Sequence, residues 1–111
     1  MIISITELRL RSVFQFPRFL KHSASSIQQA QQSKGNHLVK TKVGWLVGYT
    51  VTLWDDKESM LAFRNSHAHL AAMKEMKIVS NKYRSTNFES DSVPNWDIVK
   101  SKLKELDYKY I

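Results

Sequence analysis

The sequence contains no cysteine. This absence excludes a disulfide framework, a thiolate metal centre and a cysteine nucleophile. Motifs of several enzyme classes are missing too: there is no Gly-rich phosphate loop, no Gly-x-Ser-x-Gly elbow and no His-Glu-x-x-His pair. No window approaches the roughly 18 apolar residues of a membrane-spanning helix, and the N-terminal residues lack the basic segment and long apolar core of a signal peptide. We therefore expect a cytoplasmic protein with no membrane partner.

Acidic residues are scarce in the first half of the chain. The 111 residues carry 17 Lys and Arg against 10 Asp and Glu, a formal charge of +7. Residues 1–54 hold seven basic residues and one acidic residue, Glu7, so they contribute +6 of that charge. The basic residues are spaced singly, which favours a solvated face over a phosphate-gripping tail. With 42% hydrophobic residues, the length predicts one folded domain over 1–111.

Hydrophobic periodicity predicts four strands and several helices. Alternation of apolar and polar residues indicates strands, and apolar residues three and four positions apart indicate helices. An aspartate three residues before Glu58 predicts that Asp55 caps the second helix. The expected elements are a strand over 2–10, a helix over 17–33, strands over 37–43 and 48–54, a helix from Asp55 that breaks near Asn65 and resumes, a strand over 79–89 and a helix from Pro94.

The order βαββαβ with a C-terminal helix predicts an α+β fold of the ferredoxin-like class. In that plan a four-stranded antiparallel sheet carries both helices on one face. Both faces of the strand over 48–54 carry bulky residues, so we expect helices on one side and a partner or cavity on the other. A second copy of the chain often buries the open face of such a sheet.

A segment in the middle of the chain resembles a known superfamily. The run from Tyr49 to Met73 reads YTVTLWDDKESMLAFRNSHAHLAAM. It is similar to the dimeric α/β-barrel proteins of the antibiotic-biosynthesis-monooxygenase-like superfamily, and within it to spheroidene-monooxygenase-like and DUF3291-type members. These place a Trp-x-Asp/Glu strand end before a helix with Met and Phe, followed by Ser-Gly-x-His-x-x-Ala-Met. The segments 88–91 and 94–96 look like the family's fourth strand and its closing Pro-x-Trp. The family's Gly is His67 here, so we expect either a differently shaped helix break or a His67 side chain that shares a cavity with His69.

The resemblance implies a homodimeric α/β barrel whose sheets enclose ligand pockets. Relatives include cofactor-independent monooxygenases and haem-degrading or haem-binding oxygenases, so the cofactor is either none or haem. The leading hypothesis is a monooxygenase-like protein that binds or oxidises an apolar small molecule, with a link to haem left open. The alternative is a non-catalytic ligand-binding or assembly protein on the same fold, because fold does not fix chemistry.

His69 is the candidate catalytic residue. It shares a helix face with Met73, and a neutral imidazole there could act as a general base or ligate haem iron. The competing interpretation is a core or capping histidine. His67 lies two positions away, so the two rings diverge on a continuous helix, and no carboxylate completes a facial triad. The sequence thus predicts no metal site other than through haem.

Further candidate ligand-binding residues are aromatic or basic. Trp54 and Trp96 could stack on a planar ligand, with core packing as the competing interpretation. Arg9 and Arg11, on one face of the first strand, could pair with an acidic ligand such as a haem propionate, or could simply be solvated. His67 and Met73 join them as candidate lining residues, although methionines more often fill gaps in a core.

Nucleic-acid binding through the basic face is a minor alternative. The RNA-recognition motif shares the βαββαβ order, but it stacks bases on aromatic side chains of its first and third strands. Here Val51 stands where the central ring belongs, and residues 2–10 contain no aromatic residue. The sequence therefore does not favour a nucleic-acid partner.

Overall fold

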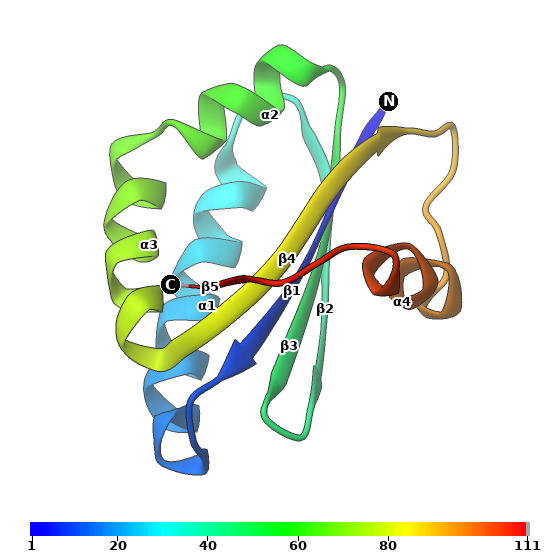
Figure 1. The fold of residues 1–111 in the computed structure, drawn as a ribbon. Helices are drawn as coiled ribbons and strands as arrows, with labels where there is room; N and C mark the ends of the chain where they lie inside the picture. The colour runs from blue at the N-terminus through cyan, green and yellow to red at the C-terminus, as the bar shows by residue number, and fades with distance from the viewer. Residues whose placement is uncertain (111) are drawn as a thin grey trace.

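The computed structural model describes residues 1–110, with the side chains of residues 67–69 and 72 outside the description. It confirms the α+β, ferredoxin-like class (Figure 1). No helix in the described chain is long and apolar enough to cross a membrane. The elements are β1 (Ile2–Leu10), the 3₁₀ turn η1 (Val13–Gln15), α1 (Phe16–Gln32), β2 (Asn36–Gly44), β3 (Val47–Trp54), α2 (Lys57–Arg64), α3 (His67–Val79), β4 (Ser80–Glu89), α4 (Trp96–Lys104) and β5 (Lys109–Tyr110).

The sheet is antiparallel with the strand order β2-β3-β1-β4-β5, so β1 lies at its centre. The four predicted strands are all present. The sequence missed the fifth, because the two residues of β5 are too few to show alternation. Lys109 and Tyr110 pair with Tyr83 and Lys82 of β4.

Strand register divides the side chains between two faces. Helices α1, α2 and α3 cover the inner face, and α4 lies against the outer face (Figure 1). On the outer face Ile3 and Ile5 of β1 are fully buried with Val51, Val99 and Leu103. On the inner face, at the other end of β1, Leu8 and Leu10 pack with Phe19 and Val79.

The position of α4 differs from the sequence expectation. We expected the second face of the sheet to be covered by a second copy of the chain or to border a cavity. Instead, the chain's own helix α4 covers part of it. Val99 and Leu103 lie four residues apart, so both point from the same side of α4 into the outer core, where each is 0% exposed.

Local signals explain where the helices begin and end. Gly35 follows α1 with φ +85°, and a Cβ there would lie 2.4 Å from Ser59 Oγ, so glycine is required on two counts. The N-cap of α2 is Asp56, whose side chain accepts from the Ser59 N–H at 2.8 Å. The prediction that Asp55 caps this helix was therefore wrong by one residue, and Asp55 instead contacts His37. The predicted break in the helix is confirmed between α2 and α3.

Candidate functional site

The two predicted histidines begin helix α3. His67 and His69 lie in its first turn, and their side chains are outside the described part of the structure. The role predicted for His69 is therefore not tested. Met73, one turn further on, is 44% exposed.

The two candidate tryptophans lie on opposite faces of the sheet. Trp54 is 1% exposed on the inner face, stacks on Phe63 with ring centroids 5.3 Å apart, and donates its indole N–H to Thr52 Oγ1 at 2.9 Å. Trp96 is half-buried on the outer face, 6.4 Å from the ring of Tyr49. The structure does not bring these two rings to one ligand.

The two candidate arginines make contacts within the chain. Arg9 lies on the outer face, where its Nε donates to Glu7 Oε2 at 2.9 Å and to the Tyr108 hydroxyl at 3.1 Å. Arg11 lies beyond β1, is exposed, and donates to the Lys77 carbonyl at 3.2 Å. Neither arginine shares a face of the sheet with Trp54.

Arg9 belongs to an ionic network around a buried carboxylate. Glu7 is 1% exposed in the middle of the sheet, and Arg84 donates to it through Nη2 at 3.0 Å and Nε at 3.2 Å. Burial raises the pKa of Glu7, but hydrogen bonds from Tyr108, Arg84 and Arg9 outweigh burial, so this pKa lies below its ordinary value. The network joins β1 and β4 to the segment before β5. Its donors and acceptors are used within the chain, which indicates a structural role.

The inner face carries a different kind of polar group. Uncharged hydroxyl and amide side chains occupy two successive inner-face positions on each of the three adjacent strands β1, β3 and β4. All of them are partly exposed, even on the central strand. We call this set the inner polar cluster: Ser4, Thr6, Thr50, Thr52, Ser85 and Asn87.

The exposure of this cluster is unexpected for the centre of a helix-covered sheet. Ile3 and Ile5 of the same strand are 0% exposed on the outer face, whereas Ser4 and Thr6, which alternate with them, retain access to solvent. The helices therefore do not pack closely on this part of the inner face. Apolar packing resumes beyond it, around Phe19 at one end and Trp54 at the other.

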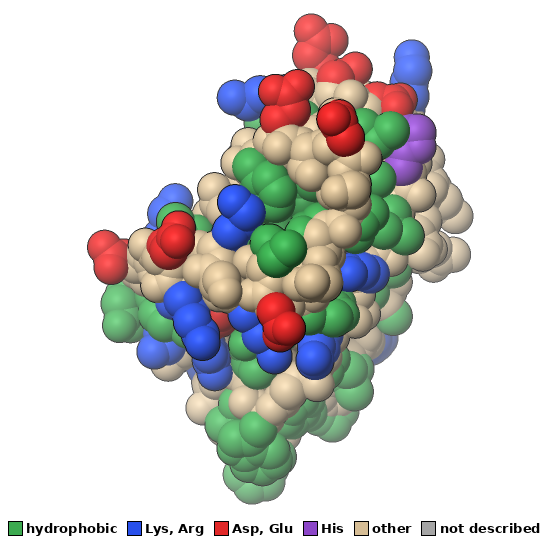
Figure 2. Space-filling model, turned by 90° about the vertical axis from the view of Figure 1, so that its right-hand side faces the viewer, with side chains coloured by type: hydrophobic (Ala, Val, Ile, Leu, Met, Phe, Trp, Pro, Cys, Tyr) green, Lys and Arg blue, Asp and Glu red, His purple; other side chains and the backbone are tan. Residues whose placement is uncertain are grey.

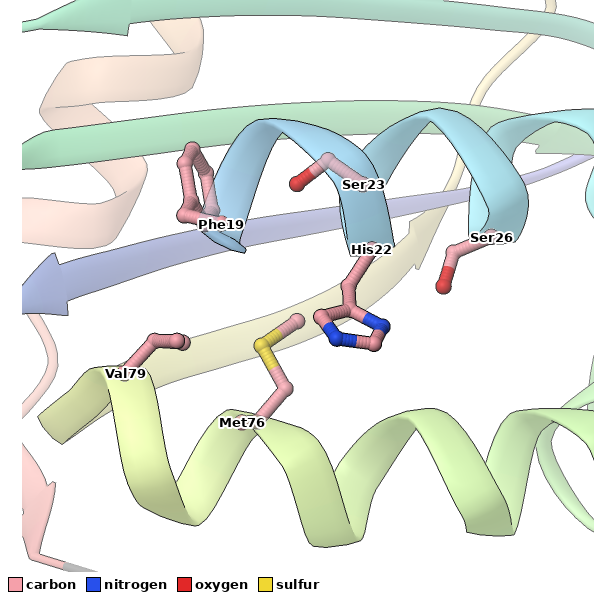
Figure 3. A pocket seen from close by; sticks show the side chains of 6 residues that line it. All are labelled: Phe19, His22, Ser23, Ser26, Met76 and Val79. Carbon is pink, nitrogen blue, oxygen red and sulfur yellow. The ribbon is translucent and has the colours of Figure 1, made fainter. Parts of the chain in front are cut away.

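Helix α1 carries small polar residues on the side that holds its buried residues. Phe19 and Ala30 are its buried residues, and Ser23 and Ser26 lie between them at helical spacing. Both serines line a pocket between α1 and α3, into which His22 and Met76 point toward one another (Figure 3). The pocket holds about 10 Å³, room for one water molecule.

The arrangement suits hydrogen bonding to an uncharged ligand better than metal or haem binding. Hydroxyls and amides donate and accept, so they can orient carbonyl and hydroxyl groups. No group of three metal-ligating side chains occurs among the described residues. The described histidines His22 and His37 contact Glu75 and Asp55, so the described residues offer haem iron no histidine that is free of a carboxylate partner.

Sequence reasoning missed the inner polar cluster, although a signal was present. The alternation of Thr50, Thr52 and Trp54 placed three residues on one face of β3, but the same face of β1 and β4 was not compared with it. Serine, threonine and asparagine at matching positions of three adjacent strands form a pattern that becomes visible only when the strand order is known.

Comparison with solved structures places the fold. A candidate antibiotic biosynthesis monooxygenase from Deinococcus radiodurans matches with a TM-score of 0.78 at 17% identity, over 86% of this chain and 97% of that one. A similarly named protein from Nitrosomonas europaea matches with a TM-score of 0.75 at 8% identity, over 83% and 100%. SnoaB, a cofactor-independent oxygenase from Streptomyces nogalater, matches with a TM-score of 0.72 at 8% identity, over 83% and 94%.

These likenesses establish a shared fold. The chain shares the fold of proteins named as antibiotic biosynthesis monooxygenases, and at identities of 8% to 17% the likeness extends to the fold alone. No family model matches the sequence, and no curated protein matches it.

Proposed function

We propose that the protein is a monooxygenase-like enzyme that binds a small organic molecule between the inner face of the sheet and helices α1 to α3. The observation that carries the proposal is the inner polar cluster, a set of partly exposed hydroxyl and amide groups where close packing is expected. Solved structures with this fold include one named as a cofactor-independent oxygenase, which favours oxygenation as the reaction.

The polar and apolar parts of this region favour a particular kind of ligand. Thr6 and Ser85 lie opposite one another with their hydroxyl oxygens 3.2 Å apart. The hydrogen bond between them uses only one of the two hydroxyl protons, so the other proton can be donated to a ligand and the remaining lone pairs can accept from it. The regions around Phe19 and Trp54 are apolar. We infer a largely apolar ring system that carries carbonyl or hydroxyl groups, which keeps the apolar ligand class predicted from the sequence.

Oxygenation of such a ligand needs no electron donor beyond the ligand itself. A base removes a proton from an acidic CH₂ group that is conjugated with a carbonyl through the ring system, and the resulting carbanion reduces O₂. One oxygen atom stays in the product as a new carbonyl, and the other leaves as water with the two hydrogens of the CH₂ group. We propose His69 as the base, and the inner polar cluster as the groups that hold the substrate carbonyl.

Oxygen uptake with a tricyclic aromatic ketone that has an acidic CH₂ group, such as anthrone, tests the proposal. We expect uptake with this probe and its loss in His69→Ala. Thr6→Val should weaken probe binding about tenfold, because it removes a hydrogen-bonding group and keeps the shape of the side chain. Thr86→Val is the matched control, since Thr86 faces the outer side of β4. Equal effects of the two valine variants, or binding without uptake, would contradict the enzyme assignment.

We also propose that the chain forms a homodimer, as the family resemblance implies. The part of the outer face that α4 leaves uncovered and the unpaired edge of β2 offer surface for a second copy. Sedimentation velocity at micromolar concentration tests this proposal, and a monomer there would contradict it.

A further inference from the structure

One end of the molecule carries exposed apolar side chains from two segments that are far apart in sequence. Phe14 in η1 is 87% exposed, and Trp45 in the turn between β2 and β3 is 74% exposed. Each has an exposed neighbour, Val13 at 45% and Val43 at 49%. We call these four residues the apolar tip. An exposed aromatic pair of this kind marks an interaction surface.

The two segments of the tip are held together. The ring of Phe16, at the start of α1, lies 6.4 Å from that of Trp45, and the Leu10 N–H donates to the Leu46 carbonyl at 2.9 Å. Figure 1 shows η1 and the β2–β3 turn at the same end of the molecule. These contacts fix the two segments that carry the exposed aromatic rings of the tip relative to one another.

The two sequence segments that form the tip contain no acidic residue, although Arg18 near the start of α1 pairs with Glu75 of α3. Both segments belong to residues 8–54, which contain seven Lys and Arg and no Asp or Glu. Arg11 precedes η1 in the sequence and Lys21 follows it, and both side chains are exposed. The guanidinium of Arg11 donates to the backbone carbonyl of Lys77, whose own side chain is a third exposed cation. In Figure 2 hydrophobic side chains gather at the lower end, and many acidic side chains lie at the opposite end.

We propose that the apolar tip inserts into the interfacial region of an anionic lipid bilayer. Trp and Phe side chains are favoured at that depth, and nearby Arg and Lys bind lipid phosphates. The basic residues near the tip favour an anionic partner. The two exposed aromatic rings favour a lipid bilayer over an acidic protein, because a bilayer accommodates them without a shaped groove. Surface docking of this kind requires no spanning helix, and it is independent of the proposed oxygenase activity.

Vesicle sedimentation with the full chain tests the proposal. We expect binding to vesicles of phosphatidylcholine with about 30 mol % phosphatidylserine, and binding at least about tenfold weaker to pure phosphatidylcholine. Trp45 is an exposed indole, whereas Trp54 is buried, so binding should shift the emission to shorter wavelength. Brominated lipid should quench that emission, and Trp45→Phe should abolish most of the quenching.

Substitutions separate lipid docking from other uses of the tip. Phe14→Ser and Trp45→Ser should each weaken vesicle binding about tenfold, the loss expected when one large apolar side chain no longer inserts. Tyr110→Ser is the matched control, since Tyr110 is 77% exposed on β5 and should bind like the parent. Absence of binding to the vesicles that contain phosphatidylserine would overturn the proposal. A change from dimer to monomer in the tip variants, with vesicle binding unchanged, would also overturn it and assign the tip to a second copy.

Discussion

Replacing Glu7 with glutamine should destabilise the fold far more than replacing an exposed glutamate. The side chain of Glu7 is 2% exposed and that of its partner Arg84 is 11% exposed, so the variant leaves a buried guanidinium without a counter-charge. Arg9 is 35% exposed on its side chain and can turn toward water. Removing one partner of a buried pair costs about 3–5 kcal/mol. Because the glutamine oxygen still accepts one hydrogen bond, we expect the lower limit, about 3 kcal/mol.

Urea unfolding of matched variants measures this difference. Glu75→Gln is the control, since Glu75 pairs with Arg18 at 2.8 Å on the surface and such pairs contribute about 0–1 kcal/mol. For a chain of this length, 3 kcal/mol lowers Tm by roughly 13 °C. A fall in the free energy of unfolding of Glu7→Gln that lies within about 0.5 kcal/mol of its fall in Glu75→Gln would refute the reasoning. Such a result would show that water solvates the Glu7 network as well as it solvates an ion pair on the surface.

The same network predicts how the difference depends on pH. The pKa of folded Glu7 lies below its ordinary value of 4.5, although burial opposes this, because Tyr108, Arg84 and Arg9 stabilise the carboxylate. The resulting stabilisation is fully present above pH 4.5 and is lost as the pH falls through the pKa of the folded state. The stability gap between the parent and Glu7→Gln should therefore narrow below that pH. A gap that is constant from pH 7 to about pH 3 would contradict the assignment of the effect to this carboxylate.

Three further substitutions have simple expectations. Gly48→Ala should lower the free energy of unfolding by about 1–3 kcal/mol in urea titrations, because a Cβ there would lie 2.4 Å from Phe19 Cζ. Asn95→Ala should lower it by about 1 kcal/mol, since the side chain caps α4 by accepting from the Ile98 N–H at 2.9 Å. Tyr108→Phe should lower it by about 1–2 kcal/mol in the same assay, because the hydroxyl lies between two charged partners.

Periodicity predicted the architecture because the elements that matter are long enough to show it. The nine residues of β1 and the seventeen of α1 lie within a residue of the predicted ranges, and the glycine after α1 has the positive φ expected of a helix end. The predicted N-cap of α2 was wrong because two adjacent aspartates satisfy nearly the same spacing rule. Asp56 contacts Ser59 and Asp55 contacts His37, and these contacts decide which aspartate caps the helix. Those contacts are set by tertiary structure.

The site was less predictable than the fold. The sequence singled out large or charged residues one by one, and the sheet separates them: Trp54 lies on the inner face, while Trp96 and Arg9 lie on the outer face. The inner polar cluster consists of residue types that are common in strands and that carry no motif. The cluster can be recognised only from the strand order, which places β1 between β3 and β4 and so brings the polar side chains of the three strands side by side.

A last substitution tests whether the inner polar cluster serves binding or folding. Thr6 contacts Ser85 at 3.2 Å, and both are partly exposed beneath the helices. If the cluster is kept for a ligand, Thr6→Val should leave the free energy of unfolding unchanged or raise it by about 0.5–1 kcal/mol, because valine suits a covered strand and the lost hydrogen bond is replaced by water. A fall of more than about 1 kcal/mol in urea unfolding would mean that the hydroxyl pair stabilises the sheet, and the cluster would then lose its value as evidence for a binding site. Probe binding that weakens while stability holds would separate the two faces of β1, with Ile3 and Ile5 maintaining the fold and Ser4 and Thr6 contacting the ligand.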